Sequence, residues 1–473
     1  MGFAAIAGET CAAVLPTVAD ARVRSGTSMR SLVARGLLAA LLGAGAACHA
    51  QALGVATWNV EWLLDAETHA RWVAACSRNG WPAELAVLPA AERAAFAGLP
   101  YCDVHNGMEF PPERCKSTRD GWPQAVRYPA DHPCRETADL ATWPRYAQKT
   151  AALAAMFRRL DAQGVGLVAL QEVSGAAAVQ PILPPGWSVT TTRELPGTPA
   201  IAQHVGVAWR KGVSVHDVTA VNALSASGVP DRPLRPGLAF TVEVAGKPVR
   251  VLVVHLKSGC RSRDLDAPLT PRDAQLAPDR QDQIASDCAM LRFQLPALED
   301  WIDANAARDF AVLGDFNRTL LREPPAESAS YRTRVDGSAA GDPQGPCTMR
   351  RDGNRWVAQC AARTRAMFPE LNDGNPAGAV LWRARFADLG RGGAIARGST
   401  GDCRIEGRHG SLAHEGIDHI LVSESLLRRL AREATTMRVV NYQDESGAPL
   451  AAAADRAIPS DHCPHVVTWS PGR

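Results

Sequence analysis

Hydrophobic and polar positions follow two different periods along the chain, so both helices and strands are expected. Residues 144–163 place their large apolar side chains on one face at helical spacing, and residues 279–306 form a second helical segment. Runs of apolar and β-branched residues predict strands at 165–170, 205–209, 239–244, 249–254, 310–313, 417–422 and 466–469. The mixture predicts an α/β fold, and the pattern by itself leaves a doubly wound sheet and two stacked sheets as alternatives.

Two long stretches interrupt this regular pattern. Residues 65–143 and 322–380 lack sustained periodicity. The first is rich in Trp, Pro and Cys, which is typical of an insertion held by disulfides. We therefore expect one domain over residues 53–473, with insertions at about 65–143 and 322–380. The sequence shows no internal repeat and no transmembrane segment in the mature chain.

The N-terminus has the features of an export signal. Arg30 and Arg35 precede an apolar run over residues 37–47, and an A-x-A cleavage site follows. The run is too short to span a bilayer, and a buried N-terminal helix is the alternative. We expect residues 1–52 to be an N-terminal extension and signal peptide, with the signal at about 29–52. The mature protein would then be secreted or periplasmic.

The charge balance provides no general attraction for a polyanion. The chain has 51 Lys and Arg and 49 Asp and Glu, and residues 1–52 contain four of the former and two of the latter. The mature chain is therefore formally neutral, so binding to nucleic acid would depend on a local group of cations. The loop after residue 258 contains arginines that could bind phosphates, but it contains as many acidic residues. The alternative is a self-compensated surface, on which these charges neutralise one another. Its charged residues include Arg261, Arg263, Arg272, Arg280, Asp264, Asp266, Asp273 and Asp279.

Cysteine usage indicates an oxidising compartment. Ten cysteines follow residue 52, an even number, and none has the C-x-x-C spacing of many zinc sites. Disulfides are therefore favoured over zinc. Cys347 and Cys360 are close enough to close a short loop, and Cys260 with Cys288 would tether the loop after the fourth predicted strand to the following helix. The sequence leaves the connectivity open.

Short polar motifs occur where the apolar runs end. Each places an acid, an amide or a histidine at a position where a predicted strand leaves the sheet. One such motif alone fits a simple turn, whereas the ordered set suits a metal site. In chain order the motif residues are Asn59 and Glu61, Gln171 and Glu172, His255 and Lys257, Asp315 and Asn317, Asp418, and Asp461 and His462.

The ordered set resembles the endonuclease/exonuclease/phosphatase family. These metal-dependent phosphoesterases include DNase I, AP endonucleases, bacterial sphingomyelinases and inositol polyphosphate 5-phosphatases. The resemblance covers about residues 54–470. It implies a four-layer α/β sandwich, in which two mixed β-sheets pack face to face and helices cover both outer faces. The two unmatched stretches would be disulfide-rich insertions.

The resemblance also implies a divalent cation as cofactor. Mg²⁺ is expected, with Ca²⁺ or Mn²⁺ as alternatives, because a hard ion prefers carboxylate and amide oxygens. Asn59 and Glu172 match residues at the metal, and Glu61 and Asp461 match residues close to it. Glu61 stands where AP endonucleases carry aspartate, so its direct ligation is open.

Two pairs of residues would carry the catalytic chemistry. His462 would exchange a proton at the reacting phosphate, because an imidazole titrates near neutral pH, and Asp418 would orient it. Asp315 would position or deprotonate the attacking water. Asn317 would hold that water or donate to a phosphoryl oxygen. For each of these residues a structural role in a turn or at a strand end is the alternative.

Three further residues match phosphate contacts of DNase-like members. His255 would donate to the phosphate, with a buried core histidine as the alternative reading. Lys257 and Arg235 would contact the substrate phosphate, unless they are ordinary loop cations. We read His419 and His465 as structural.

The residues together predict an exported Mg²⁺-dependent phosphodiester hydrolase, and a nuclease acting on extracellular DNA or RNA is the leading hypothesis. Sphingomyelinase-like hydrolysis of a lipid headgroup or a small phosphoester is the alternative. A non-catalytic binding protein on the same scaffold is a third hypothesis, which the complete motif set disfavours. AP endonucleases carry a phosphate-contacting tyrosine where this chain has none between Tyr146 and Tyr331, so repair of abasic sites is not expected. No stable protein partner is implied.

Overall fold

The computed structural model describes most of the predicted domain. All described residues belong to one compact unit, Ala50–Arg473. The proposed export signal, much of both insertions and Asp461 lie outside the described residues. The described residues are 52–79, 98–99, 144–225, 234–261, 263–320, 323, 332–334, 347–360, 362–372, 381–383, 385–386, 417–431, 436–440, 460 and 462–472.

A seven-stranded mixed sheet forms one half of the fold. Its strand order is β14-β16-β17-β1-β2-β4-β3. The neighbours β1 and β2 run parallel, as do β14 and β16, whereas the remaining neighbours are antiparallel. The strands are β1 (Leu53–Leu63), β2 (Val165–Val173), β3 (Trp187–Thr191), β4 (His204–Arg210), β14 (Arg385–Phe386), β16 (Thr436–Val439) and β17 (His465–Trp469).

A six-stranded mixed sheet forms the other half. Its order is β13-β15-β8-β7-β6-β5, with β7 and β8 parallel and the other neighbours antiparallel. The strands are β5 (Val215–Val221), β6 (Gly237–Val244), β7 (Lys247–His255), β8 (Phe310–Asp315), β13 (Leu381–Arg383) and β15 (Asp418–Ser423).

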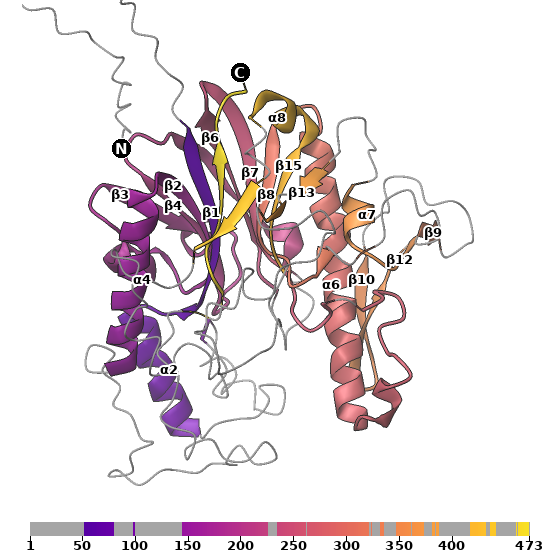
Figure 1. The fold of residues 1–473 in the computed structure, drawn as a ribbon. Helices are drawn as coiled ribbons and strands as arrows, with labels where there is room; N and C mark the ends of the chain where they lie inside the picture. Colours follow the sequence, from indigo (N-terminus) through magenta and orange to yellow (C-terminus); the bar gives the residue numbers. More distant parts are fainter. Residues whose placement is uncertain are drawn as a thin grey trace, which may run out of the picture. The chain divides into compact units, whose positions relative to one another are not determined.

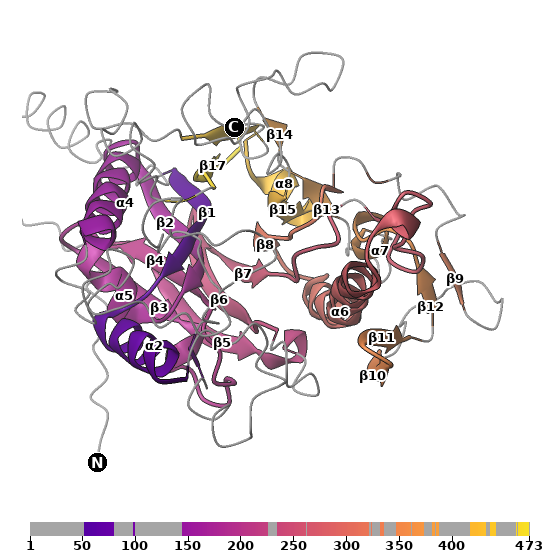
Figure 2. The same cartoon turned by 90° about the horizontal axis from the view of Figure 1, so that it is seen from below.

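The two sheets share one apolar core, and helices cover their outer faces (Figures 1 and 2). Alternate residues of β1, β2 and β4 meet alternate residues of β6, β7 and β8 in the layer between the sheets. The other face of β1 and β2 packs against α4 (Pro144–Ala162), and the outer face of β7 and β8 packs against α6 (Pro278–Asn305). Central strands are thus buried on both faces, which explains their nearly continuous apolar sequences.

Short elements join this framework. The helices are α2 (Ala66–Asn79), α5 (Ala176–Val179), α7 (Phe368–Leu371), α8 (Glu424–Arg429) and the single turns η4 (Gln180–Ile182), η5 (Thr192–Glu194), η6 (Asn222–Leu224) and η7 (Asp273–Gln275). Two small antiparallel pairs join β10 (Thr348–Asp352) with β11 (Arg355–Gln359), and β9 (Arg332–Arg334) with β12 (Ala362–Thr364). Helix α2 lies within the first expected insertion, residues 65–143, and the β10–β11 hairpin lies within the second, residues 322–380. The sequence pattern predicted no regular structure in either stretch.

Two disulfides have the expected partners. Cys260 bonds to Cys288, which ties the loop after β7 to α6, and Cys347 bonds to Cys360 across the open end of the β10–β11 hairpin. Both pairings are confirmed. Among the described residues, no helix has the length and apolar character needed to cross a bilayer.

Candidate active site

Strand register assembles the centre of the site. His255 at the end of β7 lies beside Asp315 at the end of the parallel strand β8. Asp418 at the start of β15 is the antiparallel partner of the same Asp315. In the other sheet, Asn59 of β1 lies beside Gln171 of β2. Residues far apart in sequence therefore meet where β7 and β8 end and β15 begins, and near the last residues of β1 and β2.

The strands are irregular at these positions. The pairing of β1 with β2 shifts between Asn59 and Leu63, and the pairing of β2 with β4 shifts around Glu172. Glu172 has φ 63°, Glu61 has φ 51° and Asn317 has φ 50°. Left-handed backbone is unfavourable for residues other than glycine and is concentrated at functional sites. These bulges turn the site residues out of the regular ladder.

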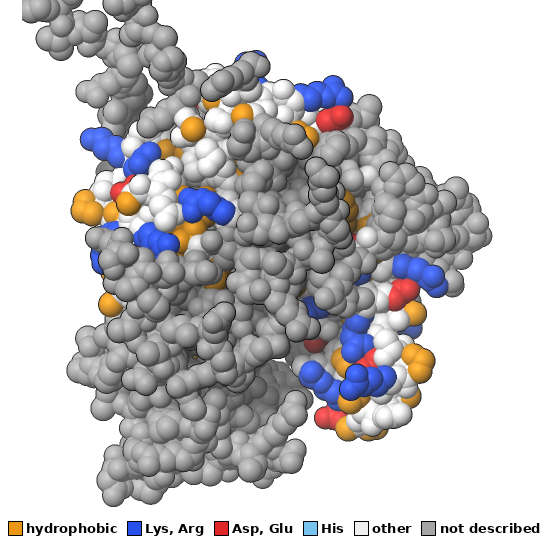
Figure 3. All heavy atoms as spheres, in the orientation of Figure 1, with side chains coloured by type: hydrophobic (Ala, Val, Ile, Leu, Met, Phe, Trp, Pro, Cys, Tyr) orange, Lys and Arg blue, Asp and Glu red, His pale blue; other side chains and the backbone are white. Residues whose placement is uncertain are grey.

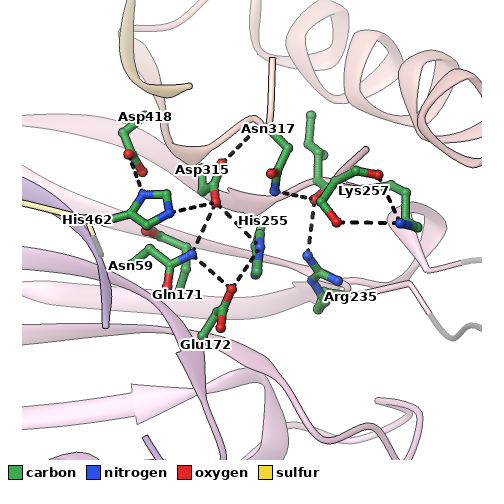
Figure 4. A network of polar contacts seen from close by, with 12 residues as sticks. Asn59, Gln171, Glu172, Arg235, His255, Lys257, Asp315, Asn317, Asp418 and His462 are labelled. Carbon is green, nitrogen blue, oxygen red and sulfur yellow. Dashed lines mark hydrogen bonds and ion pairs between the residues drawn. The ribbon is translucent and has the colours of Figure 1, made fainter. Parts of the chain in front are cut away.

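Asn59 links two of the acidic groups of the site (Figure 4). Its Nδ2 donates to Glu172 Oε1 at 3.1 Å and to Asp315 Oδ2 at 3.1 Å. Its Oδ1 accepts from the backbone N–H of Glu61 at 2.9 Å. The amide therefore fixes the separation of two carboxylates that come from different sheets.

His462 and Asp418 form a buried pair. His462 Nδ1 lies 2.6 Å from Asp418 Oδ2, and His462 Nε2 lies 4.0 Å from Asp315 Oδ2. The backbone around His462 is fixed to β1, because Trp58 Nε1 donates to His462 O at 3.1 Å and Ser460 Oγ donates to Asn59 O at 2.7 Å. The imidazole is thus held by one acid and directed at another.

Burial and mutual charge set the protonation of the acids. Burial, together with the charge of Asp418, raises the pKa of Asp315 to about 7, although His462 and the bonds from Asn317 and Asn59 oppose the shift. Burial by itself would raise the pKa of Asp418, but the charge and hydrogen bond of His462 outweigh it and lower the pKa. Asp418 is accordingly the stable anion of the pair, and Asp315 is the acid that titrates near neutral pH.

His255 is a neutral imidazole beside both carboxylates. Its Nε2 lies 3.6 Å from Glu172 Oε1 and 3.6 Å from Asp315 Oδ2. Burial lowers its pKa well below the ordinary value, and the charges of Arg235, His462 and Lys257 lower it further. Nε2 is thus placed to donate a hydrogen bond to an oxygen without adding a charge.

The expected phosphate contacts have different surroundings. Arg235 Nη2 donates to Leu256 O at 3.1 Å, and its partly buried charge faces Glu172 and Asp315. Lys257 is instead paired with Asp287 of α6, because its Nζ lies 2.9 Å from Asp287 Oδ1. Arg235 therefore belongs to the acidic centre, and the Lys257 ammonium is directed toward α6 (Figure 4).

Backbone groups take part in contacts of two other expected residues. Asn317 Nδ2 donates to Leu256 O at 3.0 Å, and its N–H donates to Asp315 Oδ1 at 2.7 Å. The carbonyl oxygen of Glu61 accepts from the ammonium of the buried Lys149. Asp461 lies outside the described residues.

The structure adds residues that the motifs did not indicate. His465, read as structural from the sequence, has its Nδ1 3.9 Å from Asp418 Oδ2, and burial lowers its pKa. Gln294 of α6 accepts from the N–H of Lys257 at 2.8 Å, which fixes the start of the loop after β7. His419 does have a structural role, since its Nε2 lies 2.9 Å from Arg318 O and its ring packs against Phe316. A single sequence carries no signal for the first two contacts.

The donor atoms fit a hard divalent cation. Ligand atoms of Asp315, Asp418 and His462 all lie within 4.8 Å of one another. The 2.6 Å contact between Asp418 and His462 is a hydrogen bond, however, and is shorter than the ~3 Å that separates two ligands each at about 2.1 Å from one octahedral ion. This hydrogen bond engages Asp418 and His462 with each other, so Asp315 is the clearest oxygen ligand of the three. The charges of Asp315 and Glu172 face the partly buried Arg235, and a divalent cation would offset them further.

Comparisons by sequence and by structure give different results. The sequence matches no protein-family profile, and no curated protein matches it at a significant level. A comparison of structures does find similar solved structures.

Three of these structures illustrate the similarity. Truncated Caenorhabditis elegans TDP2 is 13% identical over 68% of this chain and 92% of its own, with a TM-score of 0.35. The human Nocturnin catalytic domain is 14% identical over 68% and 87%, with a TM-score of 0.34. ANGEL2, a 2',3'-cyclic phosphatase, is 12% identical over 67% and 84%, with a TM-score of 0.34.

Proposed function

We propose that the protein is a metal-dependent phosphodiester hydrolase. One observation carries this proposal: the hydrogen-bonded Asp418–His462 pair is directed at Asp315, which Asn59 in turn links to Glu172. A proton-exchanging imidazole next to two oxygen ligands is what hydrolysis of a phosphodiester requires. Neither an ordinary strand end nor a binding surface needs these groups buried together.

The chain's own residues divide the chemical work. Asp418 holds His462 through Nδ1, so that Nε2 is the nitrogen that exchanges a proton with the reacting oxygens. Asp315 is placed to orient the attacking water beside His462, since its Oδ2 lies 4.0 Å from His462 Nε2. His255 donates from Nε2 to a phosphoryl oxygen. A divalent ion held by Glu172 and Asp315 would neutralise charge on the phosphate.

The leading substrate is a nucleic acid. The β10–β11 hairpin supports this choice, because Arg350, Arg351 and Arg355 are all exposed on it. Its side chains Met349 and Trp356 pack with Leu234 and Met290, and Leu234 directly precedes the site residue Arg235. Figure 3 shows basic side chains gathered over this part of the molecule. The hairpin thus offers cations to a polymer whose scissile phosphate is bound in the site.

The loop after β7 gives less support. Arg263 is ion-paired with Asp273, Arg365 with Asp264, and Arg292 with Asp266. Those pairs favour the self-compensated surface over a phosphate track at this loop. They also keep a small phosphoester or lipid headgroup as the second candidate, since such a substrate needs only the central site.

Export of the mature protein belongs to the same proposal. The disulfides Cys260–Cys288 and Cys347–Cys360 support it, because such bonds persist in oxidising compartments.

A hydrolysis panel tests the function. Purified mature protein is assayed with plasmid, single-stranded DNA, RNA, sphingomyelin vesicles and a chromogenic phosphodiester, with and without Mg²⁺. We expect Mg²⁺-dependent cleavage of nucleic acid. Turnover of sphingomyelin or the chromogenic diester alone would favour the second candidate. No turnover of any phosphodiester would contradict the proposal.

A further inference from the structure

A cluster of four polar residues fastens the ends of β1 and β2 just beyond the site. We call Asp65, Thr68, Ser174 and Arg193 the polar knot. Asp65, Thr68 and Ser174 are buried, and Arg193 covers them from η5. The four residues come from three segments, of which the outer two are 128 positions apart. Nothing in the sequence pattern joins them.

The carboxylate of Asp65 is the centre of the knot. It accepts from the Thr68 N–H at 2.8 Å, from Thr68 Oγ1 at 2.7 Å, from Ser174 Oγ at 2.7 Å and from Arg193 Nη1 at 2.8 Å. Burial alone would raise its pKa, but the bonds from Thr68 and Ser174 and the charge of Arg193 lower it. Asp65 is therefore a stable anion with both oxygens engaged.

The knot also fixes the backbone of both strands. The Asp65 N–H donates to Ser174 Oγ at 2.9 Å, and Arg193 Nη1 donates to Ser174 O at 2.9 Å. The Ser174 N–H donates to Leu63 O at 2.9 Å. A Cβ on Gly175 would lie 2.7 Å from Arg193 Cδ, so the glycine leaves the space that the arginine occupies. Strands β1 and β2 are thus clamped together immediately after their irregular segments.

Glu172 lies inside the clamped segment. Pairing of β1 with β2 is regular from Val55 and Leu167 to Asn59 and Gln171, is interrupted, and resumes at Leu63 and Val173. Glu172 occupies the interruption with φ 63°. A left-handed glutamate persists only when its surroundings hold it, because the backbone would otherwise relax toward the regular strand. The knot begins two residues later and closes the bulge from its far side.

We propose that the polar knot positions Glu172 for the metal ion, with Asp65 and Arg193 as positioning residues. This inference rests on the proposed function, in which Glu172 is a metal ligand. Groups that orient a metal ligand without touching the metal commonly change metal affinity ~10 to 100-fold when they are removed. Loss of the knot therefore weakens metal binding, because Glu172 Oε1 leaves its place beside Asn59.

A purely stabilising role is the competing explanation, and the chain contains a matched control. Asp273 accepts from the Thr270 N–H at 2.7 Å, from Thr270 Oγ1 at 2.7 Å and from Arg263. It is buried like Asp65, but it lies in the loop after β7 and not between β1 and β2. Asp273→Asn removes the same kind of network without reaching Glu172.

The test measures binding of Mn²⁺ directly. The full mature protein and the variants Asp65→Asn, Arg193→Gln, Asp273→Asn and Glu172→Gln are titrated with Mn²⁺ by electron paramagnetic resonance, and thermal unfolding is recorded in chelator. We expect Asp65→Asn and Arg193→Gln to raise the Mn²⁺ dissociation constant ~10-fold or more. Asp273→Asn should lower the unfolding temperature without changing Mn²⁺ affinity. Saturating Mn²⁺ should restore most of the kcat of Arg193→Gln on a small chromogenic diester.

Two kinds of result would overturn the inference, and they can be told apart. Unchanged Mn²⁺ affinity in Arg193→Gln, or an equal loss in Asp273→Asn, would reduce the knot to a stabilising network and leave the proposed function intact. If the unaltered protein bound Mn²⁺ no more tightly than Glu172→Gln, the proposed metal-dependent function and the role of the knot would both be overturned. Arg193 is partly exposed, so its substitution remains informative if Asp65→Asn does not fold.

Discussion

His462 Nδ1 and Asp418 Oδ2 lie 2.6 Å apart, although 44 positions separate the two residues in sequence. Asp418 starts β15 in one sheet, and His462 stands three residues before β17 in the other. The hydrogen bond therefore joins the two halves of the sandwich at the site. It fixes the imidazole tautomer, since Nδ1 donates to the carboxylate and Nε2 remains to exchange a proton.

This pairing predicts that the two residues act as a unit. His462→Ala should lower kcat for a phosphodiester by at least ~100-fold, the usual scale of general acid-base catalysis, with little change in folding. Asp418→Asn should have nearly the same effect, because it removes the negative charge that selects the Nδ1–H tautomer and stabilises the protonated imidazole. The double variant should be little worse than either single variant. Steady-state kinetics on a chromogenic diester measure all three, and losses that multiply would show that the residues work independently.

Removal of the divalent ion should abolish turnover. Chelation removes the positive charge that would neutralise the phosphate beside Glu172 and Asp315. Added Mg²⁺ should restore activity. Glu172→Gln should mimic chelation at ordinary metal concentrations. Turnover that persists in excess chelator would rule out the metal mechanism, and an unaltered Mg²⁺ requirement in Glu172→Gln would remove this residue from the metal site.

The positions of the motif residues relative to the strands could be predicted from sequence, because they depend on the local pattern of apolar and polar residues. Asn59, Glu172, Asp315 and Asp418 each terminate or begin an apolar run, and parallel or antiparallel register then brings run ends together. The runs also gave the predicted strands and the two long helices to within a few residues of their observed limits. Periodicity is a local property, so a single sequence suffices to read it.

Contacts between distant side chains were not accessible in this way. The amide of Asn59 faces two carboxylates, and the ammonium of Lys257 faces Asp287. The residue types alone do not predict which groups these side chains contact. The bond between Arg193 and Asp65 joins segments that no motif links. Such partners depend on how sheets and loops pack, and packing is a property of the whole fold.

A buried histidine should make the protein sensitive to acid. Burial, aided by the charge of Arg193, lowers the pKa of His204 from 6.5 to about 4. The folded state then binds fewer protons than the unfolded state between these values, so stability falls as the pH drops from 6.5 toward 4. The free energy of unfolding should fall by about 3 kcal/mol at most, because each unit of pKa difference corresponds to about 1.36 kcal/mol.

The variant His204→Asn isolates this effect. Asparagine can still accept the hydrogen bond from Thr192, whose Oγ1 lies 3.0 Å from His204 Nδ1, but it does not titrate. Unfolding temperatures between pH 7.5 and 4.5 should fall less steeply in the variant than in the unaltered protein. His216→Asn, which changes an exposed histidine, is the control and should leave the slope unchanged. Equal slopes in all three proteins would contradict the assignment.

Gly314 is required by the close approach of β8 to β7. Its φ is +144°, and a Cβ there would lie 2.0 Å from Val254 O. Gly314→Ala should therefore lower stability by more than about 4 kcal/mol, in the range of severe core disruptions. Gly246→Ala is the matched control, because that glycine also has positive φ but faces open space, and about 1 kcal/mol is expected. Thermal unfolding compares the two, and similar losses would show that the contact with Val254 is unimportant.

The hairpin arginines provide the test of a polymeric substrate. Arg350 and Arg351 are exposed on β10, and the Cys347–Cys360 disulfide and the packing of Trp356 on α6 hold that strand in place. If DNA crosses the hairpin, the double variant Arg350→Ala with Arg351→Ala should raise KM for DNA. The slope of log affinity against log salt concentration should become less steep by about 1 for each arginine that binds a phosphate. Hydrolysis of a small chromogenic diester should not change.

Arg428→Ala supplies the control for a general loss of charge. Arg428 is exposed on α8, which Figure 1 places at the other end of the strands from the site. Removing it lowers the net charge without touching the hairpin, so KM for DNA and its salt dependence should stay as they are. Equal effects of the hairpin and α8 variants would mean that only overall charge matters. No effect of the hairpin variant on DNA cleavage would remove the hairpin from the substrate path, and would favour a substrate small enough to be held by the central site alone.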